Sequence, residues 1–172
     1  KINGYSKSAL KYSEYNIKLC DWSSVVNLIN NYQDQVPEIP PLDLFSHNQN
    51  GFDNVQKLYE LDNRVCIIQA TGTGKSYISA SVLQINQKKD AIFVAPTNVI
   101  LNDFKNKFHY LIRHTRLMTY AKIAKINKDD KISCDLLILD ELHRAGASTW
   151  GLGVKNLIKQ NPNMLLFGAT AT

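Results

Sequence analysis

Short apolar runs are the most regular feature of the chain. Each run is β-prone and is bounded by glycine, proline or charged residues, so each one predicts a buried β-strand. The four clearest runs cover residues 65–68, 91–95, 134–139 and 164–167. A further run at residues 117–120 leads into a short helix-like stretch that ends near residue 126.

Segments with a helical spacing of apolar residues alternate with these runs. We expect helices over residues 47–61 and 77–87, from a Thr97 cap to residue 108, and over residues 154–160. Gly146, Gly151 and Gly153 predict a loop before the last of these helices. Strands followed repeatedly by helices indicate an α/β fold with a mostly parallel sheet and helices on both faces.

The first 40 residues form a separate prediction. Asp21 can cap a helix over residues 22–32, and Pro37, Pro40 and Pro41 then interrupt regular structure. We therefore expect a helical N-terminal extension at residues 1–40 and the main domain at residues 41–172.

Composition restricts the class of protein. The chain has 172 residues, 44% of them hydrophobic, with a formal net charge of +5, which permits a polyanionic partner. We expect Cys20, Cys66 and Cys134 to be reduced core residues, and no apolar run is long enough to span a membrane, which favours a cytoplasmic location. The densest basic neighbourhood is interpreted as a solvated face rather than as a binding site; it comprises Lys105, Lys107, Arg113, His114 and Arg116.

A glycine-rich segment follows the first apolar run and precedes a helix. Gly72 and Gly74 let backbone N–H groups approach an anion at a helix N-terminus. Lys75 would reach the β- and γ-phosphates of a nucleotide, and the Ser76 hydroxyl would ligate Mg²⁺. The strict phosphate-loop (Walker A) pattern has glycine where this chain has Gln69, so a simple turn before an ordinary helix stays open as an alternative.

Two adjacent acids end the run at residues 134–139. The carboxyl end of a buried strand is where α/β sheets place ligands. Asp140 can hold Mg²⁺ in the Walker B manner, and Glu141 can polarise the water that attacks the γ-phosphate. A charged strand exit that caps the next turn is the alternative.

Gln49 lies 26 residues before Lys75, at the start of a predicted helix. Its side-chain amide can donate and accept, as reading the edge of adenine requires. An exposed glutamine in a first helical turn explains the residue equally well.

The order of these motifs resembles the first RecA-like domain of superfamily 2 helicases and translocases of the DExH kind. In that family the sequence Ala-Thr-Gly-Thr-Gly-Lys-Ser at residues 70–76 is motif I, Ala-Pro-Thr at 95–97 resembles motif Ia, Asp-Glu-Leu-His at 140–143 is motif II, and Thr-Ala-Thr at 170–172 resembles motif III. The resemblance covers residues 44–172. Residues 118–120 and 142–147 are most similar to the motor subunits of restriction enzymes.

The resemblance implies that ATP and Mg²⁺ bind here, with Thr71 and Thr73 beside the phosphates. It also implies that His143 relays the state of the site towards Thr170 and Thr172. The implied partners are nucleic acid, DNA rather than RNA, and a second RecA-like domain that carries an arginine finger. Nucleic acid would contact four residues: Pro96, Thr97, Asn98 and Thr119.

Relatives often have arginine and tyrosine just before the adenine-reading glutamine, whereas this chain has Ser46 and Asn48. Adenine recognition is therefore expected less firmly than phosphate binding. Two other functions stay open: a different phosphate-loop protein, such as a small kinase or a non-helicase ATPase, and a nucleotide-gated nucleic-acid-binding module without productive hydrolysis. The first leaves His143 and residues 170–172 unexplained, and the second is disfavoured by the intact Lys75, Asp140 and Glu141.

Overall fold

The computed structural model describes residues 23–27, 39–87, 89–127 and 129–171. Its contacts divide the chain into two units, residues 1–40 and residues 41–172. In the first unit, residues 23–27 are helical, and they fall within the helix predicted over residues 22–32. The rest of that predicted helix lies outside the described residues.

Five parallel strands form one sheet in the second unit. The strands are β1 (Arg64–Ile68), β2 (Ala91–Ala95), β3 (Thr115–Thr119), β4 (Leu136–Asp140) and β5 (Leu165–Thr170). Their order across the sheet is β1-β5-β4-β2-β3, so β5 lies between β1 and β4. The predicted parallel sheet is confirmed, and all strand pairings in the described sheet are parallel.

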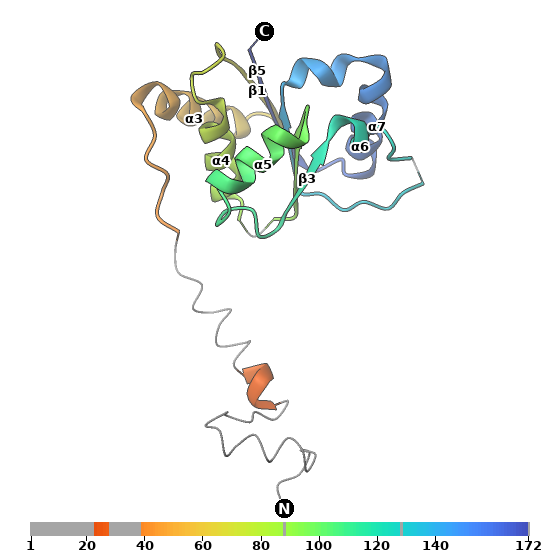
Figure 1. Cartoon of the computed structure of the whole chain (residues 1–172), viewed down its shortest axis with the longest axis horizontal. Coiled ribbons are helices and arrows are strands. Elements are labelled where there is room, and N and C mark those ends of the chain that lie inside the picture. Colours follow the sequence, from red (N-terminus) through yellow and green to blue (C-terminus); the bar gives the residue numbers. More distant parts are fainter. Residues whose placement is uncertain (1–22, 28–38, 88, 128, 172) are drawn as a thin grey trace, which may run out of the picture. The chain divides into compact units, whose positions relative to one another are not determined.

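Helices cover both faces of this sheet, as expected (Figure 1). One face carries α3 (Ser46–Tyr59), α4 (Lys75–Ile85) and α5 (Asn98–Lys107), and the other carries α6 (Tyr120–Ile123) and α7 (Ser148–Gln160). A 3-10 helix, η2 (Leu142–Gly146), follows β4. None of the helices in the described part of the chain has the length and apolar character needed to cross a bilayer.

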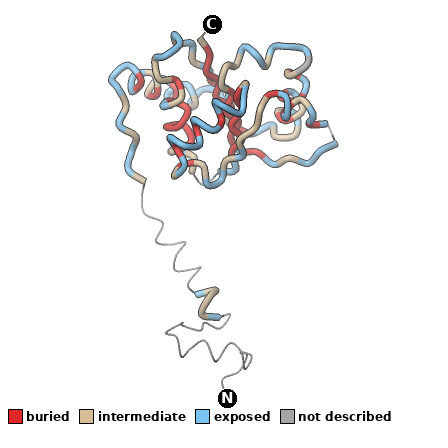
Figure 2. The backbone as a smooth tube through the Cα atoms, in the orientation of Figure 1, coloured by how far each residue is buried: buried red, intermediate tan, exposed pale blue. Residues whose placement is uncertain are grey.

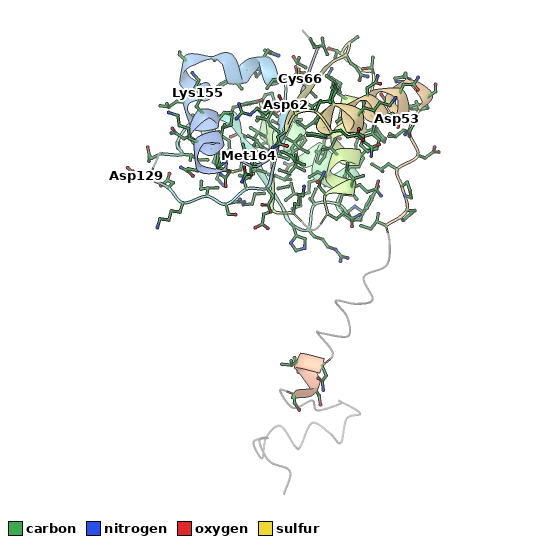
Figure 3. All side chains as sticks on the ribbon, turned by 180° about the vertical axis from the view of Figure 1, so that it is seen from behind. Asp53, Asp62, Cys66, Asp129, Lys155 and Met164 are labelled. Carbon is green, nitrogen blue, oxygen red and sulfur yellow. The ribbon has the colours of Figure 1, made fainter. Side chains whose placement is uncertain are left out.

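The central strands are buried along nearly their whole length (Figure 2). All residues of β2 are buried, and so are Leu136 to Leu139 of β4, because helices pack on both sides of these strands. Strand β1 lies at the edge, and there Cys66 is exposed (Figure 3). The prediction of a core position is therefore wrong for Cys66 and right for Cys134, while Cys20 lies outside the described residues.

The last helix begins earlier than the sequence predicts. The glycines at 151 and 153 predict a loop up to residue 153, but α7 begins at Ser148 and contains both glycines. A Cβ atom at Gly151 would lie 2.5 Å from the carbonyl oxygen of Ala145, and one at Gly153 would overlap the carbonyl of Ile123. These glycines let α7 pack closely on η2 and α6, and this gain outweighs their low helix propensity.

Candidate nucleotide-binding site

The glycine-rich loop connects the carboxyl end of β1 to the first turn of α4. Gly72 (φ 82°) and Gly74 (φ 88°) both lie in the left-handed region that favours glycine. Gly74 is the N-cap of α4, so the loop leads directly into the N-terminus of this helix. This is the arrangement that binds a phosphate group.

Lys75 lies in the hollow of the loop. Its side chain is buried, with 8% exposed, and its Nζ donates to the carbonyl oxygens of Gln69 at 3.1 Å and Ala70 at 3.2 Å. The Thr73 hydroxyl donates to the same Ala70 oxygen at 2.8 Å. Thr71 is exposed and Ser76 is half-buried in the first helical turn, so the predicted loop residues lie together.

Two residues of α3 support the loop, and sequence reasoning missed both. The Nε2 atom of His47 lies 2.9 Å from the carbonyl oxygen of Thr73, and since a carbonyl only accepts, this nitrogen donates. Asn48 is buried, with 1% exposed, and a Cβ atom at Gly74 would lie 2.5 Å from its Nδ2. Position 74 therefore requires glycine for two reasons: its positive φ angle, and the side chain of Asn48, which fills the space that a Cβ atom would need.

The acidic pair reaches the same edge of the sheet from β4. Asp140 pairs with Ala169 of β5, and Thr170 of β5 pairs with Ile68 of β1, so one strand separates the acids from the loop. Burial and the neighbouring Glu141 carboxylate raise the pKa of Asp140 to about 6, while the charge of Lys75 lowers it. Asp140 and the loop that carries Lys75 thus lie at the same edge of the sheet, on either side of β5.

Glu141 has an unusual backbone. Its φ of 53° and ψ of 55° place it in the left-handed region, and it is the only described non-glycine residue with positive φ. The amide of Arg144 donates to its carbonyl oxygen at 2.9 Å, and the Tyr120 hydroxyl lies 3.4 Å from the same oxygen. Such strained residues cluster at functional sites.

His143 connects the acidic segment to β5. Its Nδ1 lies 2.9 Å from the Thr170 hydroxyl and 3.4 Å from the Glu141 carboxylate. The structure thus brings together His143 and Thr170, for which the family resemblance predicts a relay. Thr172, predicted for the same relay, lies outside the described residues.

Gln49 is exposed in the first turns of α3, and its Nε2 donates to Asp53 at 2.7 Å. Asp53 is one turn further along the same helix (Figure 3). The structure brings the neighbouring His47 and Asn48 against the phosphate loop, whereas the contact recorded for Gln49 is within α3.

The four residues predicted to contact nucleic acid follow β2 and end β3. Thr97 and Thr119 cap α5 and α6, with their hydroxyl oxygens accepting from the amides of Ile100 and Lys122. Pro96 and Asn98 flank Thr97, and Ala95 pairs with Thr119, so the four lie together at the carboxyl edge of the sheet.

The basic residues Arg113, His114 and Arg116 lie at the other end of β3. Arg116 donates to the carbonyl of Ser133, and Lys107 pairs with Asp103 at 2.8 Å. These contacts fit the predicted solvated face.

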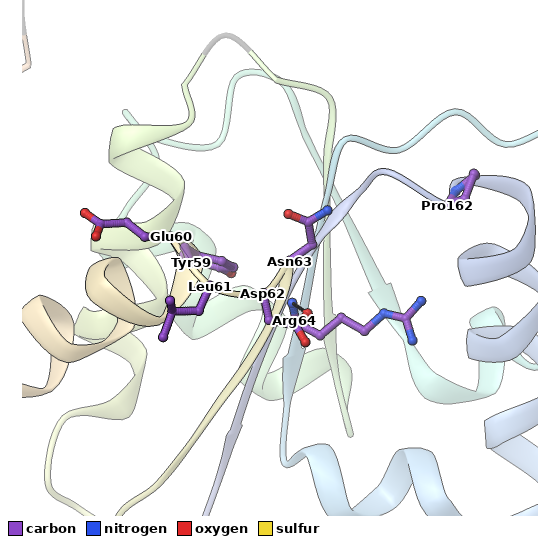
Figure 4. A pocket seen from close by; sticks show the side chains of 7 residues that line it. All are labelled: Tyr59, Glu60, Leu61, Asp62, Asn63, Arg64 and Pro162. Atoms are coloured by element: carbon purple, nitrogen blue, oxygen red, sulfur yellow. Dashed lines mark hydrogen bonds between the residues drawn. The ribbon is translucent and has the colours of Figure 1, made fainter.

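An open cavity of about 430 Å³ lies at the amino end of β1, around Arg64 and the turn after α3 (Figure 4). Because the phosphate loop follows the carboxyl end of β1, this cavity is not part of the nucleotide-binding site.

Among the described residues, no group of three or more histidine, cysteine or acidic side chains could hold a metal ion alone. Ser76 and Asp140 offer the hard oxygen ligands that Mg²⁺ prefers, and the pKa of Asp140, about 6, leaves its carboxylate ionised at neutral pH. The residues therefore fit a magnesium ion that also binds nucleotide phosphates and water.

Solved structures of an ATPase core and of helicases share this fold. The SWI2/SNF2 ATPase core of Sulfolobus solfataricus superposes with a TM-score of 0.62 at 16% identity, over 79% of this chain and 34% of that one. The Hef helicase domain of Pyrococcus furiosus gives 0.56 at 19% identity, over 69% and 32%. The UvsW helicase of bacteriophage T4 gives 0.54 at 17% identity, over 91% and 75%.

The chain thus spans about a third of the length of the first two of these proteins. A comparison with curated proteins gives no match. A family model described as type III restriction enzyme, res subunit (ResIII) matches residues 41–172. The chain therefore belongs to this family, and its second unit is a RecA-like core of the superfamily 2 helicase and translocase kind.

Proposed function

We propose that this chain is the ATP-binding half of an ATP-driven nucleic-acid helicase or translocase. One observation carries the proposal: β5 alone separates the Lys75 loop from the acidic pair, and its Thr170 contacts His143. One edge of the sheet therefore carries the Lys75 ammonium, which would bind phosphate, together with the two acids and His143, which contacts β5.

In this proposal the loop amides and Lys75 bind the β- and γ-phosphates. Lys75 has three N–H donors and uses two on loop carbonyls, which leaves one for a phosphate oxygen. Ser76 and Asp140 would hold Mg²⁺, which neutralises phosphate charge when bound. Glu141 orients the attacking water, and Gln49, with Thr71 and Thr73, completes the nucleotide contacts.

Hydrolysis requires a second RecA-like domain, which supplies an arginine to the γ-phosphate. Such arginine fingers contribute roughly 10³–10⁵ in rate, so this chain alone should bind ATP and hydrolyse it very slowly. DNA is the favoured track because the similar SWI2/SNF2 core was solved in complex with dsDNA. Pro96, Thr97, Asn98 and Thr119 would contact it mainly through phosphates.

The first experiment measures binding of a fluorescent ATP analogue to this chain with Mg²⁺. Loss of a charged hydrogen bond to phosphate costs about 1.5–3 kcal/mol, so Lys75→Ala should weaken affinity about 10- to 100-fold. Lys155→Ala, at an exposed position on α7, is the matched control. Equal affinities for the two variants would exclude the loop as the phosphate site.

The second experiment compares Glu141→Gln with wild type in the full-length protein, with DNA present. A large loss of ATP hydrolysis with retained ATP binding supports the motor. Equal hydrolysis rates would instead favour the nucleotide-gated binding module.

The third experiment measures the DNA affinity of the full-length protein at several salt concentrations. An affinity that does not change with salt concentration would exclude a contact made mainly through DNA phosphates.

A further inference from the structure

Tyr120 is a buried residue whose hydroxyl contacts the main chain of both acids. The hydroxyl donates to the carbonyl oxygen of Asp140 at 2.9 Å and lies 3.4 Å from that of Glu141. The side chain is 0% exposed. Burial raises the pKa of the Tyr120 phenol, and the charges of the two acids raise it further, so the hydroxyl keeps its proton. It is a permanent donor to the strand end that carries the acids.

The position of Tyr120 depends on the proposed nucleic-acid edge. Tyr120 is the first residue of α6, and Thr119, the last residue of β3, precedes it directly. The Thr119 hydroxyl accepts from the amide of Lys122 and so fixes the first turn of α6. A contact that shifts the β3–α6 junction would therefore shift the Tyr120 hydroxyl as well.

The backbone of Glu141, whose carbonyl oxygen lies 3.4 Å from the Tyr120 hydroxyl, is strained. A non-glycine residue in a sparsely populated backbone region costs about 1–3 kcal/mol and persists only where surrounding contacts fix it. The Glu141 carbonyl oxygen faces two donors, the Arg144 amide and the Tyr120 hydroxyl, and the Glu141 backbone N–H donates to the Asp140 carboxylate. The Glu141 backbone therefore depends in part on the Tyr120 hydroxyl, while its carboxylate also lies 3.4 Å from His143 Nδ1.

Stacked side chains hold the Tyr120 ring in place. The ring stacks on Trp150 of α7, with centroids 5.8 Å apart and planes 21° apart. The guanidinium of Arg144, in η2, lies 5.7 Å from the centroid of the Trp150 ring. Contacts therefore connect α6 through α7 to η2, which directly follows Glu141.

We propose that Tyr120 is a positioning residue that links the nucleic-acid edge to the acidic pair. Its hydroxyl fixes the main chain of Asp140 and Glu141, and this orients the Glu141 carboxylate when nucleic acid engages the β3–α6 junction. The inference rests on the proposed function and adds the regulation of the same site. It requires that removal of the hydroxyl lowers nucleic-acid-stimulated turnover without weakening ATP binding.

The test compares Tyr120→Phe with Tyr59→Phe in the full-length protein. Tyr59 is a matched control because its hydroxyl is also buried but has no hydrogen-bond partner among the described residues, at the end of α3. Loss of one hydrogen bond should lower the stimulated kcat of Tyr120→Phe about 3- to 10-fold. The KM for ATP should stay within about twofold. The melting temperature should fall by only a few degrees, as loss of one buried hydrogen bond predicts.

Stimulated rates that are equal in the two variants would overturn the proposal. A fall in kcat together with a clearly higher KM for ATP would also overturn it, because that pattern indicates a general disturbance of the site rather than a loss of stimulation. Failure of the wild-type protein to hydrolyse ATP would instead remove the proposed function. If Tyr120→Phe does not fold, Trp150→Phe decides: it loosens the stack and should reduce stimulation, whereas full stimulation counts against the link.

Discussion

At the scale of single residues, the site combines groups whose environments change their chemistry. Asp140 is the clearest case, because burial and the Glu141 carboxylate raise its pKa to about 6 and Lys75 only partly offsets this. The folded chain therefore favours the protonated acid more than the unfolded chain does. The associated stability is present at low pH and is lost as pH rises from the ordinary aspartate range through about 6.

We therefore predict that Asp140→Asn stabilises the metal-free chain, and more so at about pH 8 than at about pH 4, because asparagine never has to ionise in this environment. Urea unfolding with a chelator present measures the difference at each pH. Asp129→Asn, at an exposed position (Figure 3), gives the baseline for loss of a surface acid. A stabilisation that is the same at both pH values would contradict the effect of burial on Asp140.

At the scale of elements, the ends of neighbouring strands bring the site together. η2 follows β4, and its His143 contacts Thr170 at the end of β5, so the acidic segment and the strand beside the phosphate loop are connected by a side-chain hydrogen bond. Gly168 of β5 permits this approach, because a Cβ atom there would lie 2.5 Å from Cδ2 of Leu142.

A double-mutant cycle should detect this connection. His143→Ala and Thr170→Val should be non-additive by about 0.5–1 kcal/mol in the free energy of unfolding, because either change removes the same hydrogen bond. The cycle is needed because Thr170 has other contacts, and the energies of those contacts cancel when the single and double mutants are compared. Pairing Thr170→Val with Lys155→Ala on α7 should give additive effects. Full additivity of the first pair would mean that the hydrogen bond does not contribute to stability.

The sequence predicts the elements better than it predicts their contacts. Strands β2 and β4 are apparent as apolar runs because both faces of a central parallel strand are buried. The start of α7 is not apparent from the sequence, because the glycines of α7 allow close packing against α6 and η2 and do not form a loop. The supporting roles of His47, Asn48 and Tyr120 depend on where α3 and α6 lie, which no local pattern encodes.

At the scale of the whole molecule, the proposed boundary near residue 40 decides what can fold alone. All buried apolar side chains among the described residues come from position 52 onward. The family model also begins at residue 41. Just inside that boundary, the amide of Leu42 donates to the side chain of Gln84 on α4 at 3.1 Å. We therefore expect the domain to need residues 41–44 but not the residues before them.

Two truncated chains test this expectation. A chain of residues 41–172 should match the intact chain in melting temperature and in affinity for an ATP analogue, because it keeps α3 over the phosphate loop and the Leu42 bond. A chain of residues 45–172 keeps α3 but loses that bond, so its free energy of unfolding should fall by about 0.5–1.5 kcal/mol. A large loss of stability or nucleotide affinity in the 41–172 chain would place residues 1–40 within the ATP-binding domain rather than beside it.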